Sequence, residues 1–134
     1  MLDINNAKNF VENNLFEKIE KKDFNSQVKE IKLITKVSTS QIRKFLSAVN
    51  KINNKIRYQN NDDILSEDIV AEIAYMRVQF AYIVGRNKNN KGLEKLHKEL
   101  DGAIANIKNS KSNFINFARY VEAIVAYHKF FGGD

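Results

Sequence analysis

The sequence predicts an all-α fold: a single antiparallel bundle of about five helices, with an extended linker before the second helix. Apolar residues recur at three- and four-residue spacing along most of the chain, which is the period of amphipathic helices. The 134 residues include no proline, so no helix is broken from within. Apart from Gly102, the glycines stand where helices are expected to stop.

The first helix is expected within residues 1–21, because Phe10, Val11, Leu15 and Ile19 follow the helical period. The segment is rich in asparagine and is therefore a weak helix former. We expect docking against the other helices to supply most of its stability.

Residues 22–37 are predicted to be an extended linker. Ile31, Leu33 and Val37 stand at odd-numbered positions, as in a strand. A single strand is not stable alone. We therefore expect the linker to lie across the helices or to pair with another chain.

Residues 38–134 are expected to form the core bundle. Ser38 and Gln41 match a capping box, which starts a second helix of about residues 39–57. The next helix is expected to start at a Ser66 cap and to stop at Gly85, in the left-handed cap conformation.

Two more helices complete the predicted bundle, one over about residues 91–108 and one from near Ser112 to Gly132. The buried positions predicted for the four helices of the core bundle are Ile42, Phe45, Leu46, Val49, Ile52, Ile69, Ile73, Met76, Phe80, Ile83 or Val84, Leu93, Leu96, Leu100, Ile104, Ile107, Phe114, Phe117, Val121, Ile124, Val125, His128 and Phe131.

Composition restricts the function classes. The net charge of +6 favours an anionic partner, most often nucleic acid, although an abundance of lysine and asparagine can also reflect codon usage. Without cysteine the chain has no disulfide, thiolate metal site or thiol nucleophile. The sequence shows no signal peptide or membrane span, so we expect a cytoplasmic protein.

No catalytic constellation is found in the sequence. His97 and His128 fall on different predicted helices with no carboxylate at ligand spacing, and each is expected to be a helix-end cation or a partly buried ring. We therefore expect no enzyme activity, no metal and no cofactor.

Cationic positions are the main candidates for contact with an anionic partner. Lys44, Lys51 and Lys55 fall on one face of the second helix. Arg77 and Arg119 stand beside buried stripes, and each is either a paired structural residue or a fork for phosphate.

A second basic run comprises Arg86, Lys88, Lys91, Lys95 and Lys98. It either tracks phosphates or forms a solvated face, since glutamates interrupt it.

The last helix combines rings and cations off its main apolar stripe. Tyr120, Tyr127 and Phe130 stand beside Arg119 and Lys129. A face of this kind suggests a docking surface for protein or for RNA bases.

Three segments together resemble a known family: TSQIRKFLSAVN at 39–50, YMRVQFAYIVGR at 75–86 and ARYVEAIVAYHKFFGG at 118–133. Their order and spacing are similar to those of the small subunit of Csm-type (type III-A) CRISPR effector complexes. The resemblance runs from Val37 to the C-terminus.

The resemblance implies a non-catalytic helical subunit of an antiviral ribonucleoprotein. Copies of such a subunit form an inner filament, beside the backbone subunits and the large subunit, and contact the backbone of the guide RNA–target RNA duplex. It favours RNA contact for Arg43, Arg77, Arg86 and Arg119, and no membrane partner is implied. The alternative is a generic basic helical adaptor or homodimer whose charge is incidental.

The expected site residues follow from these patterns and this resemblance. For RNA contact they are Arg43, Lys44, Lys51, Arg77, Arg86, Arg119 and Lys129. For subunit docking they are Tyr120, Tyr127 and Phe130.

Overall fold

The structure, a computed structural model, describes residues 3–22, 29–58 and 63–132. Within these ranges the chain forms five helices and one β-hairpin, which confirms the predicted all-α bundle. The elements are α1 (Ile4–Asn14), β1 (Phe16–Lys22), β2 (Lys29–Thr35), α2 (Thr39–Ile56), α3 (Glu67–Gly85), α4 (Lys91–Ala105) and α5 (Lys111–Phe130).

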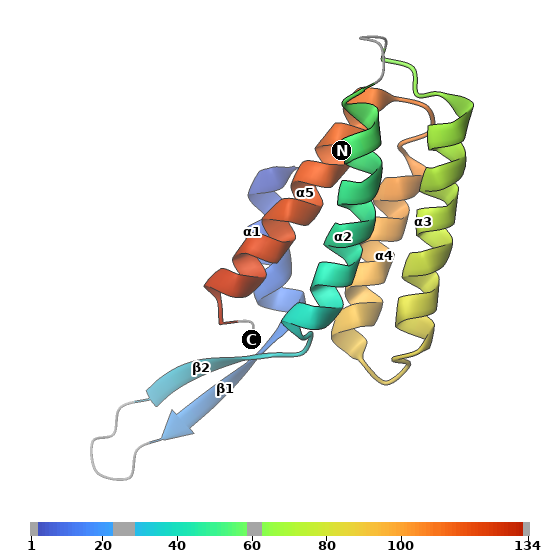
Figure 1. The fold of residues 1–134 in the computed structure, drawn as a ribbon. Coiled ribbons are helices and arrows are strands. Elements are labelled where there is room, and N and C mark those ends of the chain that lie inside the picture. The colour runs from blue at the N-terminus through green and yellow to red at the C-terminus, as the bar shows by residue number, and fades with distance from the viewer. Residues whose placement is uncertain (1–2, 23–28, 59–62, 133–134) are drawn as a thin grey trace.

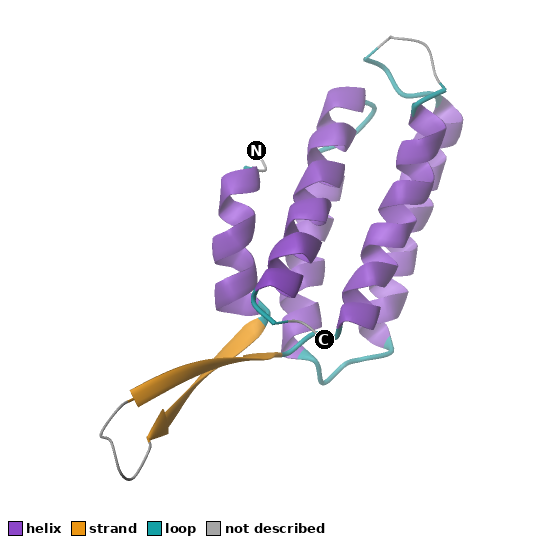
Figure 2. Ribbon diagram, turned by 60° about the vertical axis from the view of Figure 1, so that its left-hand side comes forward, coloured by secondary structure: helices purple, strands orange, loops and turns teal. Residues whose placement is uncertain are grey.

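Helices α2 to α5 run alternately up and down and form the body of the molecule (Figure 1). Helix α2 packs against α3 and α5, and α4 packs against α3 and α5. The shorter α1 packs on α5 and α4 from one side. The hairpin extends away from one end of the bundle, as Figure 2 shows from a second side.

The core is aromatic and aliphatic and runs the length of the bundle. Phe45 of α2 meets Phe80 of α3 with ring centroids 4.6 Å apart, and Phe114 and Phe117 of α5 are fully buried. Burying each such ring contributes roughly 2–3 kcal/mol. The core is what holds the helix surfaces, described below, in fixed positions.

The prediction for the N-terminal helix is wrong in its length. Helix α1 ends at Asn14 rather than near residue 21, and Phe16–Lys22 forms a strand. Leu15 and Phe16 are both buried, with the Phe16 ring 5.4 Å from His128. The packing of Phe16 against α5 and the pairing of the residues after it with β2 override the helical period here.

The prediction for residues 22–37 is half right where the structure describes the chain, and its residues 23–28 lie outside the described residues. Lys29–Thr35 is extended, but it pairs antiparallel with β1 of the same chain, from Phe16↔Thr35 to Lys22↔Lys29. It neither lies across the helices nor needs another chain. At the hairpin base the Lys36 N–H donates to the Leu15 carbonyl at 2.8 Å, and Val37 is fully buried.

The predicted start signals of α2 and α3 are confirmed. The Ser38 hydroxyl accepts from the Gln41 N–H at 3.1 Å, and the Gln41 side chain accepts from the Ser38 N–H at 3.0 Å. The Ser66 hydroxyl caps α3 by accepting from the Ile69 N–H. Each bond satisfies a donor that the first helical turn leaves open.

Two predicted helix ends differ from the structure. Helix α3 ends at Gly85 as predicted, but the backbone there is not left-handed. The cap residue Arg86 has right-handed helical backbone angles, and among the described glycines the positive φ belongs to Gly132. Helix α4 ends at Ala105. Helix α5 starts at Lys111, close to the predicted Ser112. Its cap is Ser110, and the Ser112 hydroxyl donates to Asp63 in the segment before α3.

Candidate nucleic-acid interface

A shallow groove of about 1070 Å³ runs between α2 and α3, and we call it the α2–α3 groove. Its α2 wall carries cations and its α3 wall carries exposed rings and apolar groups. The cations are Arg43, Lys44 and Lys51 of α2, and the exposed rings and apolar side chain are Tyr75, Val78 and Tyr82 of α3. The remaining lining residues are Thr39, Ser40, Ser47, Ala48, Gln79 and Ile83.

The helical register sets both walls. Helix α2 turns one face to the core through Phe45 and Val49, which leaves Lys44 and Lys51, two turns apart, on an outer face. Helix α3 turns one apolar face to the core through Met76. A second apolar face of the same helix, with Tyr75 and Tyr82, is exposed. The predicted line-up of Lys44 and Lys51 is thus confirmed.

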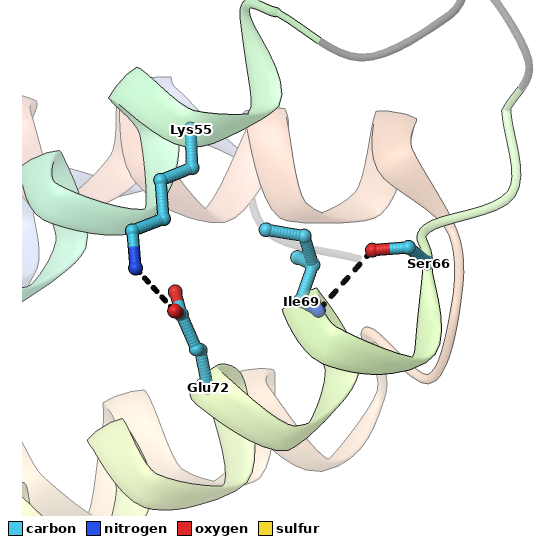
Figure 3. A network of polar contacts seen from close by, with 4 residues as sticks. All are labelled: Lys55, Ser66, Ile69 and Glu72. Carbon is cyan, nitrogen blue, oxygen red and sulfur yellow. Dashed lines mark hydrogen bonds and ion pairs between the residues drawn. The ribbon is translucent and has the colours of Figure 1, made fainter.

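An ion pair bridges the two helices beyond one end of this groove. Lys55 of α2 and Glu72 of α3 point toward each other and form an ion pair, close to the Ser66 cap of α3 (Figure 3). Lys51 precedes Lys55 by one helical turn and lines the groove. Lys55 is therefore engaged within the protein, whereas Lys51 faces the groove.

The positive surface continues past the other end of the groove. The Arg86 guanidinium lies over the Tyr82 ring, 5.7 Å from its centroid. Arg86 lines a small depression with Lys44 and Tyr82. It also lines a second depression that contains Lys88, Lys91 and one acidic residue, Glu17. The first part of the second basic run therefore joins the surface that begins at the groove.

The electrostatic character of the groove is one-sided. No acidic side chain is among the described residues that line it. Nor, within the described part of the chain, is a carboxylate found at ion-pair distance from Arg43, Lys44 or Lys51. Such a wall attracts anions, because each cation is compensated by solvent and salt alone.

Arg77 lies outside the groove and is engaged within the protein. Its Nε and Nη2 atoms donate to the two carboxylate oxygens of Asp101 on α4, at 2.5 and 3.0 Å. Hydrogen bonding to Arg77 lowers the pKa of Asp101 from its ordinary value, and the same contact raises the pKa of Arg77. The geometry matches the paired structural alternative left open by the sequence.

The other two predicted RNA contacts lie on a different helix. Arg119 is exposed on α5, which lines neither wall of the α2–α3 groove. Lys129 lies in the last turn of α5, where a cation stabilises the carboxyl end of the helix. The structure therefore gathers Arg43, Lys44, Lys51 and Arg86, and separates Arg77, Arg119 and Lys129 from them.

The predicted docking surface on α5 is wrong at Tyr120. That side chain is 1% exposed, and its hydroxyl donates to Glu99 at 3.1 Å. The prediction failed because α5 is covered by α1, α2 and α4, so its buried face is wider than one stripe. Tyr127 is half-buried near Phe131, and Phe130 remains 74% exposed.

Tyr75 and Val78 are site residues that sequence reasoning missed. They are 64% and 62% exposed, comparable to Tyr82 at 65%. The available signal was that α3 is apolar on two faces, whereas packing against a bundle requires only one. The surplus face is the one that lines the groove.

The described residues contain no group of three His, Asp or Glu side chains that could hold a metal ion. His97 is half-buried on α4, and His128 is buried with its Nε2 atom 2.6 Å from the Val37 carbonyl oxygen. Among the helices of the described ranges, none has the length and apolar character that crossing a membrane demands.

Comparison with known proteins bears on what this surface serves. Residues 13–134 match the family model Csm2 Type III-A. The CRISPR system Cms protein Csm2 of Enterococcus italicus is 34% identical over 98% of this chain and 90% of its own. The proteins of the same name from Streptococcus thermophilus and Mycobacterium tuberculosis are 36% and 30% identical, over 72% and 70% of this chain and 74% of each relative. The chain therefore belongs to the Csm2 family of type III-A CRISPR systems, the small subunits of Csm complexes.

Proposed function

We propose that this chain is a non-catalytic small subunit that contacts the backbone of the guide RNA–target RNA duplex in a cytoplasmic type III-A complex. In this role copies of it form the inner filament, beside the backbone and large subunits. Membership of the Csm2 family supports the assignment to the complex. The observation that carries RNA contact is the α2–α3 groove, with three cations on one wall and no acidic side chain among the described lining residues.

The arrangement suits a partner that is recognised by charge and shape. A subunit that serves any guide sequence must contact phosphate and ribose rather than base edges. Lys44 and Lys51 lie about 10 Å apart along a rigid helix, and Arg86 extends the same surface. Each such contact is weak alone, but repetition along a filament raises the effective affinity by orders of magnitude.

The test is a charge reversal in the assembled complex. Lys44→Glu/Lys51→Glu should leave the helical content unchanged, because both side chains are exposed, and should weaken target-RNA binding. Each single reversal, Lys44→Glu or Lys51→Glu, is matched by Lys8→Glu, a charge reversal at an exposed position of α1 that lines neither the groove nor the depressions beside it. Salt dependence should also change, with the slope of log affinity against log salt falling by roughly 0.7–0.9 for each phosphate that the variant no longer neutralises.

Two results would remove the proposal. One is a complex carrying the double charge reversal that binds target RNA with unchanged affinity and unchanged salt dependence. The other is an equal loss in the Lys8→Glu control, which would show that only overall charge matters. A chain that self-associates and has negligible RNA affinity at low salt would instead favour the homodimeric adaptor.

A further inference from the structure

The α3 wall of the groove carries an aromatic surface that backbone contact does not explain. Tyr75, Val78 and Tyr82 are each more than 60% exposed on a helix whose core face is already complete. An isolated exposed ring needs no explanation, but these three side chains line one groove together. They form a second recognition element opposite the cations.

The Tyr75 and Tyr82 rings lie on the same side of α3. Tyr75 and Tyr82 are seven residues apart on α3, so they lie on one face about 10 Å apart along the axis. Val78 lies between them on the same wall. The Arg86 guanidinium stacks over Tyr82 at 5.7 Å, which restricts that ring and adds a cation beside it.

Charge complementarity selects the occupant of this groove. An apolar protein segment would cover Arg43, Lys44 and Lys51 without supplying partners for them, and burial of unpaired charge is costly. An RNA strand supplies phosphates for the cations and flat bases for the rings. Bases within a duplex are already stacked and paired, so only unpaired nucleotides can offer their faces to tyrosine.

We propose that the α2–α3 groove binds unpaired nucleotides of an RNA strand, with bases stacked on Tyr75 and Tyr82 and phosphates at Arg43, Lys44 and Lys51. This inference rests on the proposed function and deepens it. It states that the duplex whose backbone the cations contact is locally unpaired at this groove, so that the rings as well as the cations hold the strand.

The test compares two probes on the full chain at low salt. One probe is a short unstructured RNA that carries 2-aminopurine, whose fluorescence is quenched by stacking. The other is the same RNA annealed to its complement. The ring variant is Tyr75→Leu/Tyr82→Leu, which keeps apolar area at exposed positions, and the charge variant is Lys44→Glu/Lys51→Glu. The matched ring control is Tyr58→Leu, because Tyr58 is 91% exposed and does not line the groove.

The ring variant should bind single-stranded RNA about tenfold or more weakly, lose the quenching and retain its duplex affinity. Tyr58→Leu should behave like the unaltered chain, and the charge variant should weaken both probes. Wild-type affinity of the ring variant for the single strand overturns this inference, as does an equal loss for both probes. Failure of the unaltered chain to bind the single strand also overturns it.

The outcomes separate this inference from the function beneath it. If the charge variant binds the duplex more weakly while the ring variant keeps its affinity for both probes, backbone contact is supported and base stacking is rejected. If the charge variant keeps its affinity for both the single-stranded and the duplex probe, contact between the groove and the RNA backbone is rejected. If the ring variant binds RNA normally but fails to enter the assembled complex, the groove holds a protein segment and the inference is overturned.

Discussion

Arg77 of α3 and Asp101 of α4 form a two-pronged ion pair, with Nε–Oδ1 and Nη2–Oδ2 distances of 2.5 and 3.0 Å. The pair joins neighbouring helices across 24 residues of sequence and lies on the surface, with side-chain exposures of 46% and 32%. The paired hydrogen bonds fix the orientation of α3 relative to α4. They add little to the free energy of unfolding, because solvent screens a pair that is this exposed. The helix–helix contact, rather than RNA, is the function that the distances support for Arg77.

The first prediction concerns that pair. Arg77→Ala should lower the free energy of unfolding by about 0.5–1 kcal/mol, as expected for an exposed pair of good geometry. Target-RNA binding should stay unchanged, in contrast to Arg43→Ala. Denaturant unfolding of Arg77→Ala, Asp101→Asn and the double variant measures the coupling energy. Additive single effects would show that the pair does not contribute, and a loss of RNA affinity in Arg77→Ala would return this arginine to the RNA surface.

The second prediction concerns acid. Hydrogen bonds from Arg77 lower the pKa of Asp101 in the folded chain, so its carboxylate contributes stability above the unfolded pKa of about 3.9. That contribution is lost as the pH falls through the lower folded value. Between pH of about 4 and 2 the stability of the unaltered chain should therefore decline more steeply than that of Asp101→Asn. Thermal or urea unfolding across this range is the measurement, and parallel curves for the two proteins would contradict it.

The third prediction concerns Tyr120, which the structure moves from the surface to the core. Tyr120→Phe removes the hydroxyl that donates to Glu99 but keeps the buried ring, so it should destabilise by about 0.5–1.5 kcal/mol. Tyr58→Phe, at a 91% exposed position, is the control and should have no measurable effect. Burial and the nearby Glu99 raise the pKa of Tyr120 in the folded chain, so its contribution to stability should be complete below the unfolded pKa of about 10 and should be lost as the pH rises above that value. Equal stability of the two variants would show that the hydrogen bond is not maintained.

What the sequence could predict is what depends on near neighbours in the chain. The α2 start was predictable because Ser38 and Gln41 satisfy each other within one turn. The exposure of Lys44 and Lys51 was predictable because helical register alone places them opposite the core. Both features need no knowledge of another element.

What could not be predicted depends on partners distant in sequence. Leu15 fits the helical period of the residues before it, and only the packing of Phe16 against α5 shows that the chain turns into a strand there. The partner of Arg77 is on the next helix, and spacing alone does not distinguish a buried-face neighbour from a phosphate contact. The exposure of Tyr75 follows from which of two apolar faces of α3 meets the core, and composition leaves that choice open.

The fourth prediction concerns the junction between the hairpin and the bundle. Gly92, in the first turn of α4, is buried, and a Cβ atom there would lie 2.9 Å from Val37 Cγ2 and 3.0 Å from Lys36 Cβ. The contact with Val37 is closer than real Cβ atoms make, and the contact with Lys36 is tighter than most. Val37 is itself fully buried, so it has little room to move away.

Gly92→Ala should therefore destabilise the chain by about 1–3 kcal/mol, as overpacking of a core does. Gly102→Ala is the matched control on the same helix, because nothing lies within 4 Å of a Cβ there. It should stabilise by about 0.4–1 kcal/mol, since alanine is the better helix former. Urea unfolding of both variants gives the comparison. A Gly92→Ala protein at least as stable as Gly102→Ala would mean that the segment from the hairpin to α2 does not pack on α4 as closely as the structure places it.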